Sequence, residues 1–511
     1  MSQAKRIMLI ECSAPHWLDV AEHLQGNAIE VAYWTGWYRV GNEVWNKFPA
    51  TTFHDTLHAK RAIGPDGASR PIGRFDDACA AIWEIDAALV YDMMNRFDYS
   101  RDQSFVEKST LFYDHLVYWR GVLDRLAPHL VVFSTPPHVV YDFVLLALCR
   151  HLKIKTLMFE EATIRPPYCL AMTDYREGSR TLAAASRQCH TIGDETRQIV
   201  ARLRGDYRDA KPAREVVAHE AMARAMLEGI DGLREKARIV EGIDLQHGGT
   251  YETNEKLVNT SSLYKEQGIS LRQSFEGTYA NTRFMQQRIS EQAVTEELRE
   301  FYHSHATASE ALNRPFVYVA LAGQPERTSN PQAERYANQL LMVNQIAMTA
   351  PDGWVVAVRE HPNQFHPEFA VNMCRDIDYY RAMLMSPAVR LLPTVGSPFD
   401  IIDRAAAVAT TGGTSALEAV ARGKPALLFG NAWYRDCPGV HRIRSIADLD
   451  QFWASLAGGA LRTVLDDFTN YVEAITVGCF RGIGDYPPDD WPVSREENVD
   501  NLFDVLMRVV E

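Results

Sequence analysis

The segment from residue 405 to residue 430 constrains the fold most, because it reads as strand, turn, helix and strand in quick succession. An apolar run, A-A-A-V-A-T, precedes the turn T-G-G-T-S, and A-L-E-A-V-A then leads through G-K-P into A-L-L-F-G. This order places the turn where the carboxyl end of a strand meets the amino end of a helix. Free backbone N–H groups and the positive end of the helix dipole gather at such a point, so the segment predicts an anion site.

The residue types in the turn suit a phosphate. Gly412 and Gly413 let the backbone approach a ligand closely, and the hydroxyl groups of Thr414 and Ser415 add hydrogen-bond donors. A glycine pair before a helix is more often structural than ligand-binding. The functional interpretation therefore depends on what accompanies the turn.

A second motif, R-E-H-P at residues 359–362, closes the apolar strand V-V-A-V. Ligand-facing residues follow the strands of an open α/β sheet, so Arg359 and His361 are candidates to meet a negatively charged group. Another His-Pro pair stands at residues 366–367, and we favour His361 because it directly follows the strand. Together the two motifs predict a site for a nucleotide-linked anionic leaving group.

Size and charge set the broad class. With 511 residues the chain exceeds what one hydrophobic core normally supports, so two domains are expected. Its 53 basic and 66 acidic residues give a net charge of −13, which argues against nucleic-acid binding. The eight scattered cysteines and the lack of a signal peptide or a long apolar run predict a cytoplasmic protein. Peripheral association with the inner face of the membrane is left open.

The pattern along the chain predicts four regions. Strands expected at residues 6–11, 29–34, 129–133 and 156–159, with a helix at 139–152, make residues 1–210 an α/β domain with a parallel sheet. Residues 211–312 form a helical segment, with candidate helices at 214–240 and 291–305; it either shapes the acceptor side or adds a layer to the first domain.

A second α/β domain spans residues 313–485, with strands at 316–322 and 354–358 and a helix at 332–349. An amphipathic helix at 496–509, within the last region 486–511, is expected to pack back on the first domain. The predicted fold is therefore α/β, with two Rossmann-like domains facing a cleft. This is the layout of a GT-B glycosyltransferase.

Residues 316–444 resemble the bacterial capsule polysaccharide synthesis family, which contains Kdo transferases. The matching pieces are Q-P-E (324–326), R-E-H-P (359–362), T-G-G-T-S-A-L-E-A (411–419), G-K-P (423–425) and F-G-N-A-W-Y (429–434). GT-B sialyltransferases look similar at a coarser level. They carry an acidic pair followed by glycine in the first domain, then a His-Pro and a Ser/Thr pair in the second. Here the acidic pair is Glu160-Glu161, followed by Ala162.

The resemblance implies a donor of the CMP-ulosonate kind, such as CMP-Kdo or CMP-sialate. The positions it implies for donor binding are Gln324, Glu326, Arg359, His361, Pro362, Thr411, Gly412, Gly413, Thr414, Ser415 and Glu418. Glu418 lies one helical turn past Thr414, where it either reaches ribose hydroxyls or stays a solvated carboxylate. The leaving group of such a donor is a phosphate monoester, so neither a metal ion nor a further cofactor is expected.

On the acceptor side, a carboxylate must deprotonate the attacking hydroxyl or attack the sugar itself. Glu160 and Glu161 follow the strand T-L-M-F, and only one of two adjacent residues on an extended chain faces the cleft. We favour Glu160 by analogy with the first acid of the sialyltransferase pair. His138 and Asp142, after another strand of the first domain, are weaker candidates, and Asp142 is better explained as a residue that caps or solvates its helix.

The leading hypothesis is a glycosyltransferase that moves an acidic sugar from CMP to a surface-glycan or glycolipid acceptor. Two alternatives stay open. One is a UDP-sugar transferase or epimerase on the same fold, and the other is a non-catalytic nucleotide-sugar-binding protein of glycan assembly. The donor sugar, the linkage, the stereochemical outcome and the oligomeric state are not specified by the sequence.

Overall fold

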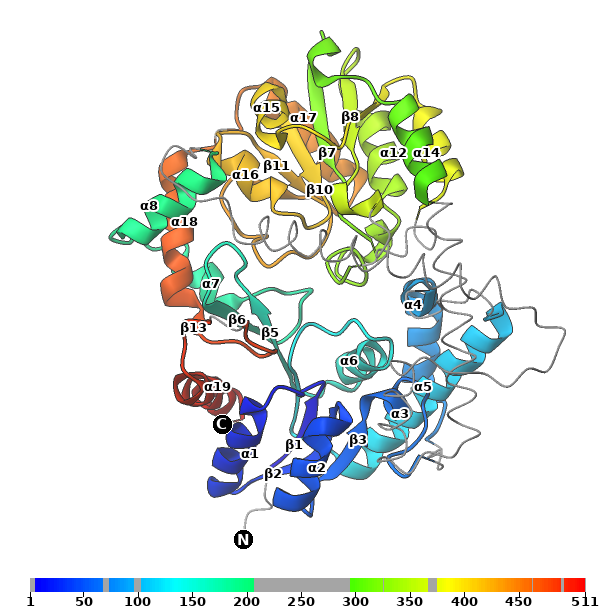
Figure 1. Cartoon of the computed structure of the whole chain (residues 1–511), viewed down its shortest axis with the longest axis vertical. Coiled ribbons are helices and arrows are strands. Elements are labelled where there is room, and N and C mark those ends of the chain that lie inside the picture. Colours follow the sequence, from blue (N-terminus) through cyan, green and yellow to red (C-terminus); the bar gives the residue numbers. More distant parts are fainter. Residues whose placement is uncertain are drawn as a thin grey trace, which may run out of the picture.

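The computed structural model describes residues 5–67, 73–95, 103–205, 295–324, 326–365, 375–461, 463–488 and 491–510. Two α/β units, one built mainly from the amino-terminal half and one from the carboxyl-terminal half, lie end to end (Figure 1). This arrangement confirms the predicted fold class, two Rossmann-like domains of the GT-B type. No helix within the described ranges is both long and apolar enough to cross a membrane.

In the described residues, the first unit contains a sheet of seven strands in the order β13-β6-β5-β4-β1-β2-β3. The strands are β1 (Lys5–Ile10), β2 (Ile29–Gly36), β3 (Thr52–Asp55), β4 (Leu130–Phe133), β5 (Thr156–Glu161), β6 (Tyr168–Met172) and β13 (Phe480–Arg481). Strand β6 runs antiparallel to both β5 and β13, and the remaining pairs are parallel. The chain order therefore reverses between β1 and β4, the position at which open α/β sheets bind ligands.

Helices cover both faces of this sheet. They are α1 (His16–Gly26), α2 (Tyr38–Lys47), α3 (Thr56–Ala59), α4 (Asp77–Asn95), α5 (Phe105–Leu126) and α6 (Tyr141–Leu152). Successive strand residues point to opposite faces. Ile7 and Leu9 of β1 accordingly belong to the cluster with α1, whereas Met8 and Ile10 belong to the cluster with α4, α5 and α6.

The second unit contains a sheet whose six strands, as far as the chain is described, are all parallel and in the order β12-β11-β10-β7-β8-β9. The strands are β7 (Phe316–Ala320), β8 (Val355–Arg359), β9 (Val389–Leu392), β10 (Ala407–Thr410), β11 (Ala426–Leu428) and β12 (Val440–Arg442). Its helices are α12 (Leu340–Thr349), α14 (Ile377–Leu384), α15 (Pro398–Arg404), α16 (Ser415–Ala421) and α17 (Ile446–Ala457). Residues 295–304 are also helical. The strand order reverses between β7 and β10, which makes these strands the switch point of the second sheet.

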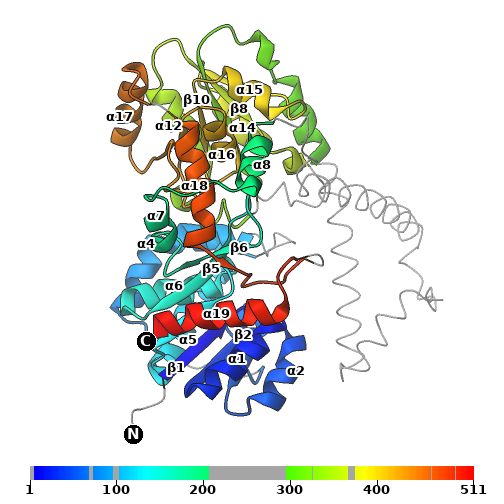
Figure 2. The same cartoon turned by 90° about the vertical axis from the view of Figure 1, so that its left-hand side faces the viewer.

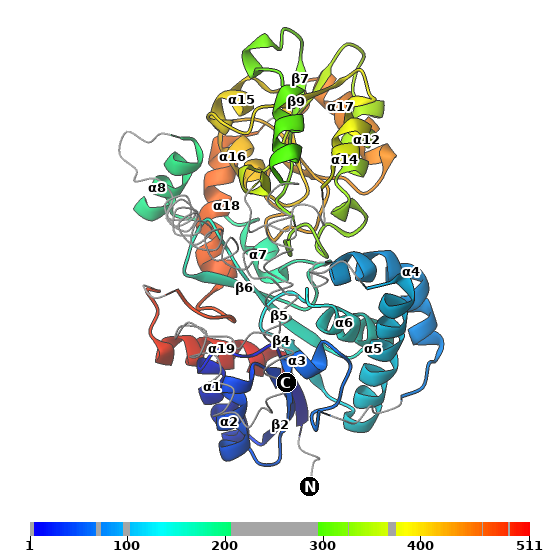
Figure 3. The ribbon, with the colours of Figure 1, turned by 45° about the vertical axis from the view of Figure 1, so that its right-hand side comes forward.

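Helices α7 (Arg180–Ala185), α8 (Asp194–Leu203) and α18 (Leu465–Gly478) join the two units, and α19 (Arg495–Val510) covers the first. Both α7 and α8 contact α18, and α8 and α18 also contact α16. Helix α18 runs between the two units and leads into β13 of the first sheet (Figure 2). Helix α19 (Arg495–Val510) then packs on α1, where Val499, Leu502 and Leu506 are buried (Figure 3).

Several boundaries differ from the sequence prediction. The chain returns to the first sheet at β13, before residue 486, and α8 packs on the second unit although it precedes residue 210. The helix expected at 332–349 begins only at Leu340. Residues 334–337 instead form the 3-10 turn η2 (Glu334–Ala337). An α-helix cannot run through Glu334, because its φ of 51° lies outside the right-handed helical range. The expected helix at residues 214–240 lies outside the described residues.

Candidate active site

The loops after β7 and β10 meet at the switch point of the second sheet. A methyl group added to Gly412 would lie 3.6 Å from the carbonyl oxygen of Thr328. A methyl group added to Gly323 would lie 2.9 Å from Glu326 Oε1 and 3.4 Å from His361 Nδ1. The loop of residues 326–332 therefore connects the glycine turn to the R-E-H-P motif, and the three sequence motifs of the second domain converge at one place.

The glycine turn has a different hydrogen-bond pattern from the one that the sequence predicted. The backbone N–H groups of Gly412 and Gly413 were expected to be free, but both are directed at Thr410 Oγ1, at 3.4 Å and 3.1 Å. The hydroxyl is available because Thr410 is the last residue of β10 and fully buried beneath the turn. Within the described residues, the buried hydroxyl oxygens of Thr411 and Ser415 have no hydrogen-bond partner. These hydroxyl groups are the unsatisfied polar atoms of the turn.

Glu418 lies half-buried on α16, one turn from Thr414. Thr414 Oγ1 donates to Glu418 Oε1 at 3.3 Å. Burial raises the pKa of Glu418, and this effect outweighs the opposing hydrogen bond from Thr414 and the charges of Arg422 and Arg359. The carboxylate is thus partly removed from water, unlike a solvated helix residue.

The R-E-H-P motif divides into anchoring and accessible groups. Arg359 is 6% exposed and donates to the carbonyl oxygens of Thr394 and Gly396, at 2.6 Å and 2.8 Å. The carboxylate of Glu360 accepts the backbone N–H of His361 at 2.8 Å. His361 is half-buried, and Pro362 begins the 3-10 turn η3 (Pro362–Phe365). His366 lies outside the described residues.

A buried ion pair holds this motif in place. Glu360 and Arg375 are 2.8 Å apart, and neither side chain is exposed. Tyr380 also donates its hydroxyl to Glu360, at 2.7 Å. Arg375 donates to the side-chain oxygen of Gln324 as well. The pair therefore fixes the loops after β7 and β8 against each other.

Gln324 is anchored, whereas Glu326 lies closer to the surface. The amide of Gln324 donates to the carbonyl oxygen of Ala337 at 2.6 Å, and its backbone exchanges two hydrogen bonds with the side chain of Gln364. Glu326 is half-buried and accepts from Thr328 Oγ1 at 3.2 Å. In this structure Gln324 positions the loop, and Glu326 stands beside His361.

Glu160 is the residue of the acidic pair that meets the second domain. It is the penultimate residue of β5 and only 4% exposed. Its Oε1 accepts from Gln332 Nε2 at 3.0 Å and forms an ion pair with Arg327 at 3.4 Å. Its Oε2 has no hydrogen-bond partner within the described residues. Glu161 ends the strand and is half-buried.

The side chains that surround Glu160 were not singled out from the sequence. Arg327 and Gln332 follow the Q-P-E motif in the polar run R-T-S-N-P-Q, and this polarity was the only local signal for them. Tyr434, whose hydroxyl donates to the Gly413 carbonyl at 2.5 Å, lies in the F-G-N-A-W-Y motif. Arg435, the next residue, had no local signal, because its contacts come from distant parts of the chain.

The switch point of the first sheet holds a separate polar cluster. Asp142 is the second residue of α6 and accepts the backbone N–H groups of His138, Val139 and Phe143 at 2.7–3.0 Å. It therefore holds the preceding loop and does not cap the helix, because the N-cap residue is Val140, which makes no side-chain capping bond. Burial raises the pKa of Asp142 to about 7, and the nearby charge of Glu11 adds to the shift. Glu11, directly after β1, was not singled out from the sequence; the hydroxyls of Tyr141 and Thr56 donate to it.

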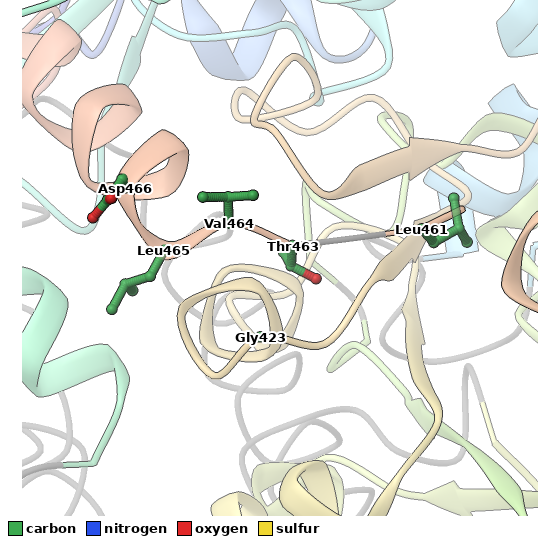
Figure 4. A pocket seen from close by; sticks show the side chains of 6 residues that line it. All are labelled: Gly423, Leu461, Thr463, Val464, Leu465 and Asp466. Atoms are coloured by element: carbon green, nitrogen blue, oxygen red, sulfur yellow. The ribbon is translucent and has the colours of Figure 1, made fainter. Parts of the chain in front are cut away.

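Two cavities differ in their relation to these residues. One, of about 330 Å³, lies between the domains, because its lining combines Arg176 of the first with Asn431 and Arg442 of the second. The other, of about 570 Å³, is an open groove lined by residues 423, 461 and 463–466, at the end of α16 opposite the glycine turn (Figure 4). In the described ranges, no group of three or more His, Cys, Asp or Glu side chains is arranged to hold a metal ion.

Comparison with known proteins gave matches among solved structures only. No protein-family model and no curated protein matches this chain. Similar structures include Thermosulfurimonas dismutans KpsC, a beta Kdo 2,7 transferase, with 9% identity over 81% of this chain and 96% of that one, at a TM-score of 0.30. UDP-GlcNAc 2-epimerase from Neisseria meningitidis, bound to UDP-GlcNAc, has 11% identity over 99% of both chains at a TM-score of 0.21. The UDP complex of S. aureus MnaA has 9% identity over 92% of both chains, at 0.26.

Proposed function

We propose that this chain is a glycosyltransferase that takes an acidic sugar of the ulosonic class from a CMP-activated donor and transfers it to a hydroxyl group of a glycan or glycolipid. One observation carries the proposal. The carboxylate of Glu160, from the first domain, sits against the loop of residues 326–332, and that loop also reaches Gly412 and the surroundings of His361. Groups suited to an acceptor and to a donor thus meet at one place.

The donor side of this site offers neutral hydrogen-bond donors together with an imidazole. The unpartnered hydroxyls of Thr411 and Ser415 suit phosphate oxygens. His361 would donate a hydrogen bond or a proton to the phosphate as the bond between the sugar carbon and the phosphate oxygen breaks. A preorganised donor of this kind contributes about 2.7–4 kcal/mol to transition-state stabilisation. Glu418, one turn along α16, is assigned to the ribose hydroxyls.

The acceptor side relies on Glu160. Its Oε1 is already bonded to Gln332 and paired with Arg327, which fixes the carboxylate group. Its Oε2 has no partner within the described residues and would accept the proton of the attacking hydroxyl. In a single displacement the acceptor oxygen bonds to the sugar carbon, the phosphate leaves, and Glu160 holds the proton. If Glu160 attacked the sugar itself, a covalent adduct would form first.

Nucleotide binding tests this proposal most directly. We expect CMP to raise the melting temperature of the protein without added divalent metal, and UDP to do so less. At about one hundred times its dissociation constant a ligand stabilises the folded state by about 2.7 kcal/mol. A shift that requires magnesium or manganese would contradict the metal-independent mechanism. A clear preference for UDP would favour the UDP-sugar transferase or epimerase instead.

Turnover separates an enzyme from a binding protein. We expect the protein to release CMP from CMP-Kdo or CMP-sialate in the presence of an acceptor glycan. The Glu160→Gln variant should still bind free CMP but should no longer release CMP from either donor. Nucleotide binding with no turnover of either donor, under conditions in which a panel of acceptor glycans is supplied, would favour the non-catalytic alternative.

A further inference from the structure

The cavity between the domains is lined by more positive than negative charge. Its charged lining consists of Arg176, Glu334, Arg335, Arg442 and Arg444. Arg176 is neutralised, because it pairs with Glu334 at 2.5 Å and with Asp86 at 3.5 Å. Among the described residues, the ion pairs include none for the other three arginines. The lining therefore carries three guanidinium groups without a bonded counterion.

A further guanidinium group, without an ion pair among the described residues, lies directly behind this wall. Arg435 is only 2% exposed and donates to the carbonyl oxygens of Arg176, Asn431 and Ala432, at 2.7 Å, 3.1 Å and 3.1 Å. It also donates to the carbonyl oxygen of Tyr175. In the described part of the chain its hydrogen-bond partners are all neutral. A buried charge with neutral partners alone is costly, because the hydration that it lost is only partly replaced.

The guanidinium groups share one amide. Asn431 Oδ1 accepts from Arg435 at 3.3 Å and from Arg442 at 3.5 Å. Burial lowers the pKa of Arg435 to about 10, and the charge of Arg442 lowers it further. Burial and the charge of Arg444 likewise lower the pKa of Arg442, although Asp436 and Glu334 act in the opposite direction. For Arg435 the charges of Glu160 and Asp436 act in the opposite direction, so burial is the main reason that its pKa is lowered.

The cavity is separate from the donor side of the site and is linked to the acceptor side. It lies at the carboxyl ends of β11 and β12, whereas the glycine turn follows β10. Asn431 in its wall donates to the carbonyl oxygen of Gln332 at 3.1 Å, and the side chain of Gln332 bonds to Glu160. The wall of the cavity is therefore linked through a single residue, Gln332, to the candidate acceptor-side carboxylate.

We propose that this arginine-lined cavity binds a phosphate monoester group, and that this group belongs to the acceptor. Three unpaired guanidinium groups match the charge of about −1.5 to −2 on a phosphate monoester better than the single charge of a carboxylate. Planar guanidinium groups also donate in pairs to phosphate oxygens. The assignment to the acceptor rests on the proposed transferase function, whereas phosphate binding itself does not.

Calorimetric titration with inorganic phosphate and with N-acetylglucosamine 1-phosphate tests the proposal. A charge-assisted hydrogen bond contributes roughly tenfold to a dissociation constant. We therefore expect the dissociation constant to rise about tenfold for Arg442→Gln and further for the double variant Arg442→Gln/Arg444→Gln. Arg442→Lys, which keeps the charge, should lose less. The matched control is Arg381→Gln/Arg508→Gln, which removes the same charge from α14 and α19 and should bind like the wild type.

The outcomes separate this proposal from the function proposed above. CMP binding should be unchanged in the Arg442→Gln/Arg444→Gln variant, because the cavity is not the donor site; a loss of both ligands would overturn the proposal of a separate phosphate site. No binding of phosphate by the wild type, equal weakening in the control, or stronger binding of citrate than of the phosphates would also overturn it.

Binding of phosphatidic acid vesicles but not of the soluble sugar phosphate would support a lipid phosphate, and the reverse would support a sugar phosphate. The variant should fold, because it removes groups that repel each other, and Arg442→Lys tests the site if it does not.

Discussion

Replacing Glu160 by glutamine separates its chemical contribution from its structural one. The amide keeps the size and shape of the side chain, and its oxygen can still accept the hydrogen bond from Gln332. The ion pair with Arg327 is lost, but it spans 3.4 Å and the arginine side chain is 27% exposed. Glu160 itself is only 4% exposed, but the separation is long and water screens the arginine, so the pair contributes about as much as a solvent-exposed one, about 0–1 kcal/mol of folding stability. We therefore expect the unfolding free energy to change by no more than about 1 kcal/mol.

The effect on turnover should be much larger. A positioned general base accelerates a reaction by about 10²–10⁴-fold, and glutamine cannot take up the proton. At about 1.36 kcal/mol for each factor of ten, this loss corresponds to about 2.7–5.4 kcal/mol of activation free energy. The predicted loss of activity thus exceeds the predicted loss of stability several times over.

The assay is CMP release from the donor in the presence of acceptor, together with CMP binding and urea denaturation of each variant. Glu161→Gln is the matched control, since it makes the same chemical change one residue away, and we expect it to cost little activity. Near-normal transfer by Glu160→Gln would refute the assignment, and so would an equal loss in both variants. A sugar adduct trapped on Glu160 would identify a nucleophile and a retaining mechanism.

Three further predictions concern the rest of the site. His361→Ala should lower turnover at least about a hundredfold, as expected for a lost general acid, while the turnover of His366→Ala should stay within a few-fold of the wild type. A larger loss in His366→Ala would show that the second His-Pro pair is the functional one. Arg375→Met leaves Glu360 buried without a counterion and should lower the free energy of unfolding in urea by about 3–5 kcal/mol. The control Arg381→Met, on the exposed face of α14, should lower it by under about 1 kcal/mol, and similar losses in both variants would contradict the buried-pair interpretation. The folded-state pKa of Asp142, about 7, lies above its ordinary value of 3.8, so the protonated carboxyl stabilises the fold at low pH and this contribution is lost as the pH rises toward 7. The unfolding free energy of the wild type relative to Asp142→Asn should therefore fall between about pH 4 and pH 7. A rise over that range would contradict the raised pKa.

Local sequence determined the elements that carry the motifs. The apolar runs around residues 355–359, 407–410 and 426–428 became β8, β10 and β11, and T-G-G-T-S became the turn before α16. Each of these depends on hydrophobic periodicity and on turn chemistry within a few residues, which a single sequence displays directly. The alternation of strands and helices determined the α/β class in the same way. The polar residues at the strand ends were visible for the same reason.

Tertiary structure alone decided which side chains meet. Glu160 and Gln332 are 172 residues apart and touch only because the two domains are packed together. The Glu360–Arg375 pair and the buried guanidinium of Arg435 also depend on contacts that no local pattern specifies. Even the free N–H groups expected at Gly412 and Gly413 were lost to the hydroxyl of Thr410, whose side-chain direction is set by packing. The sequence shows which groups can act as donors and acceptors, but their partners depend on strand order and domain packing, which bring distant residues within hydrogen-bonding distance.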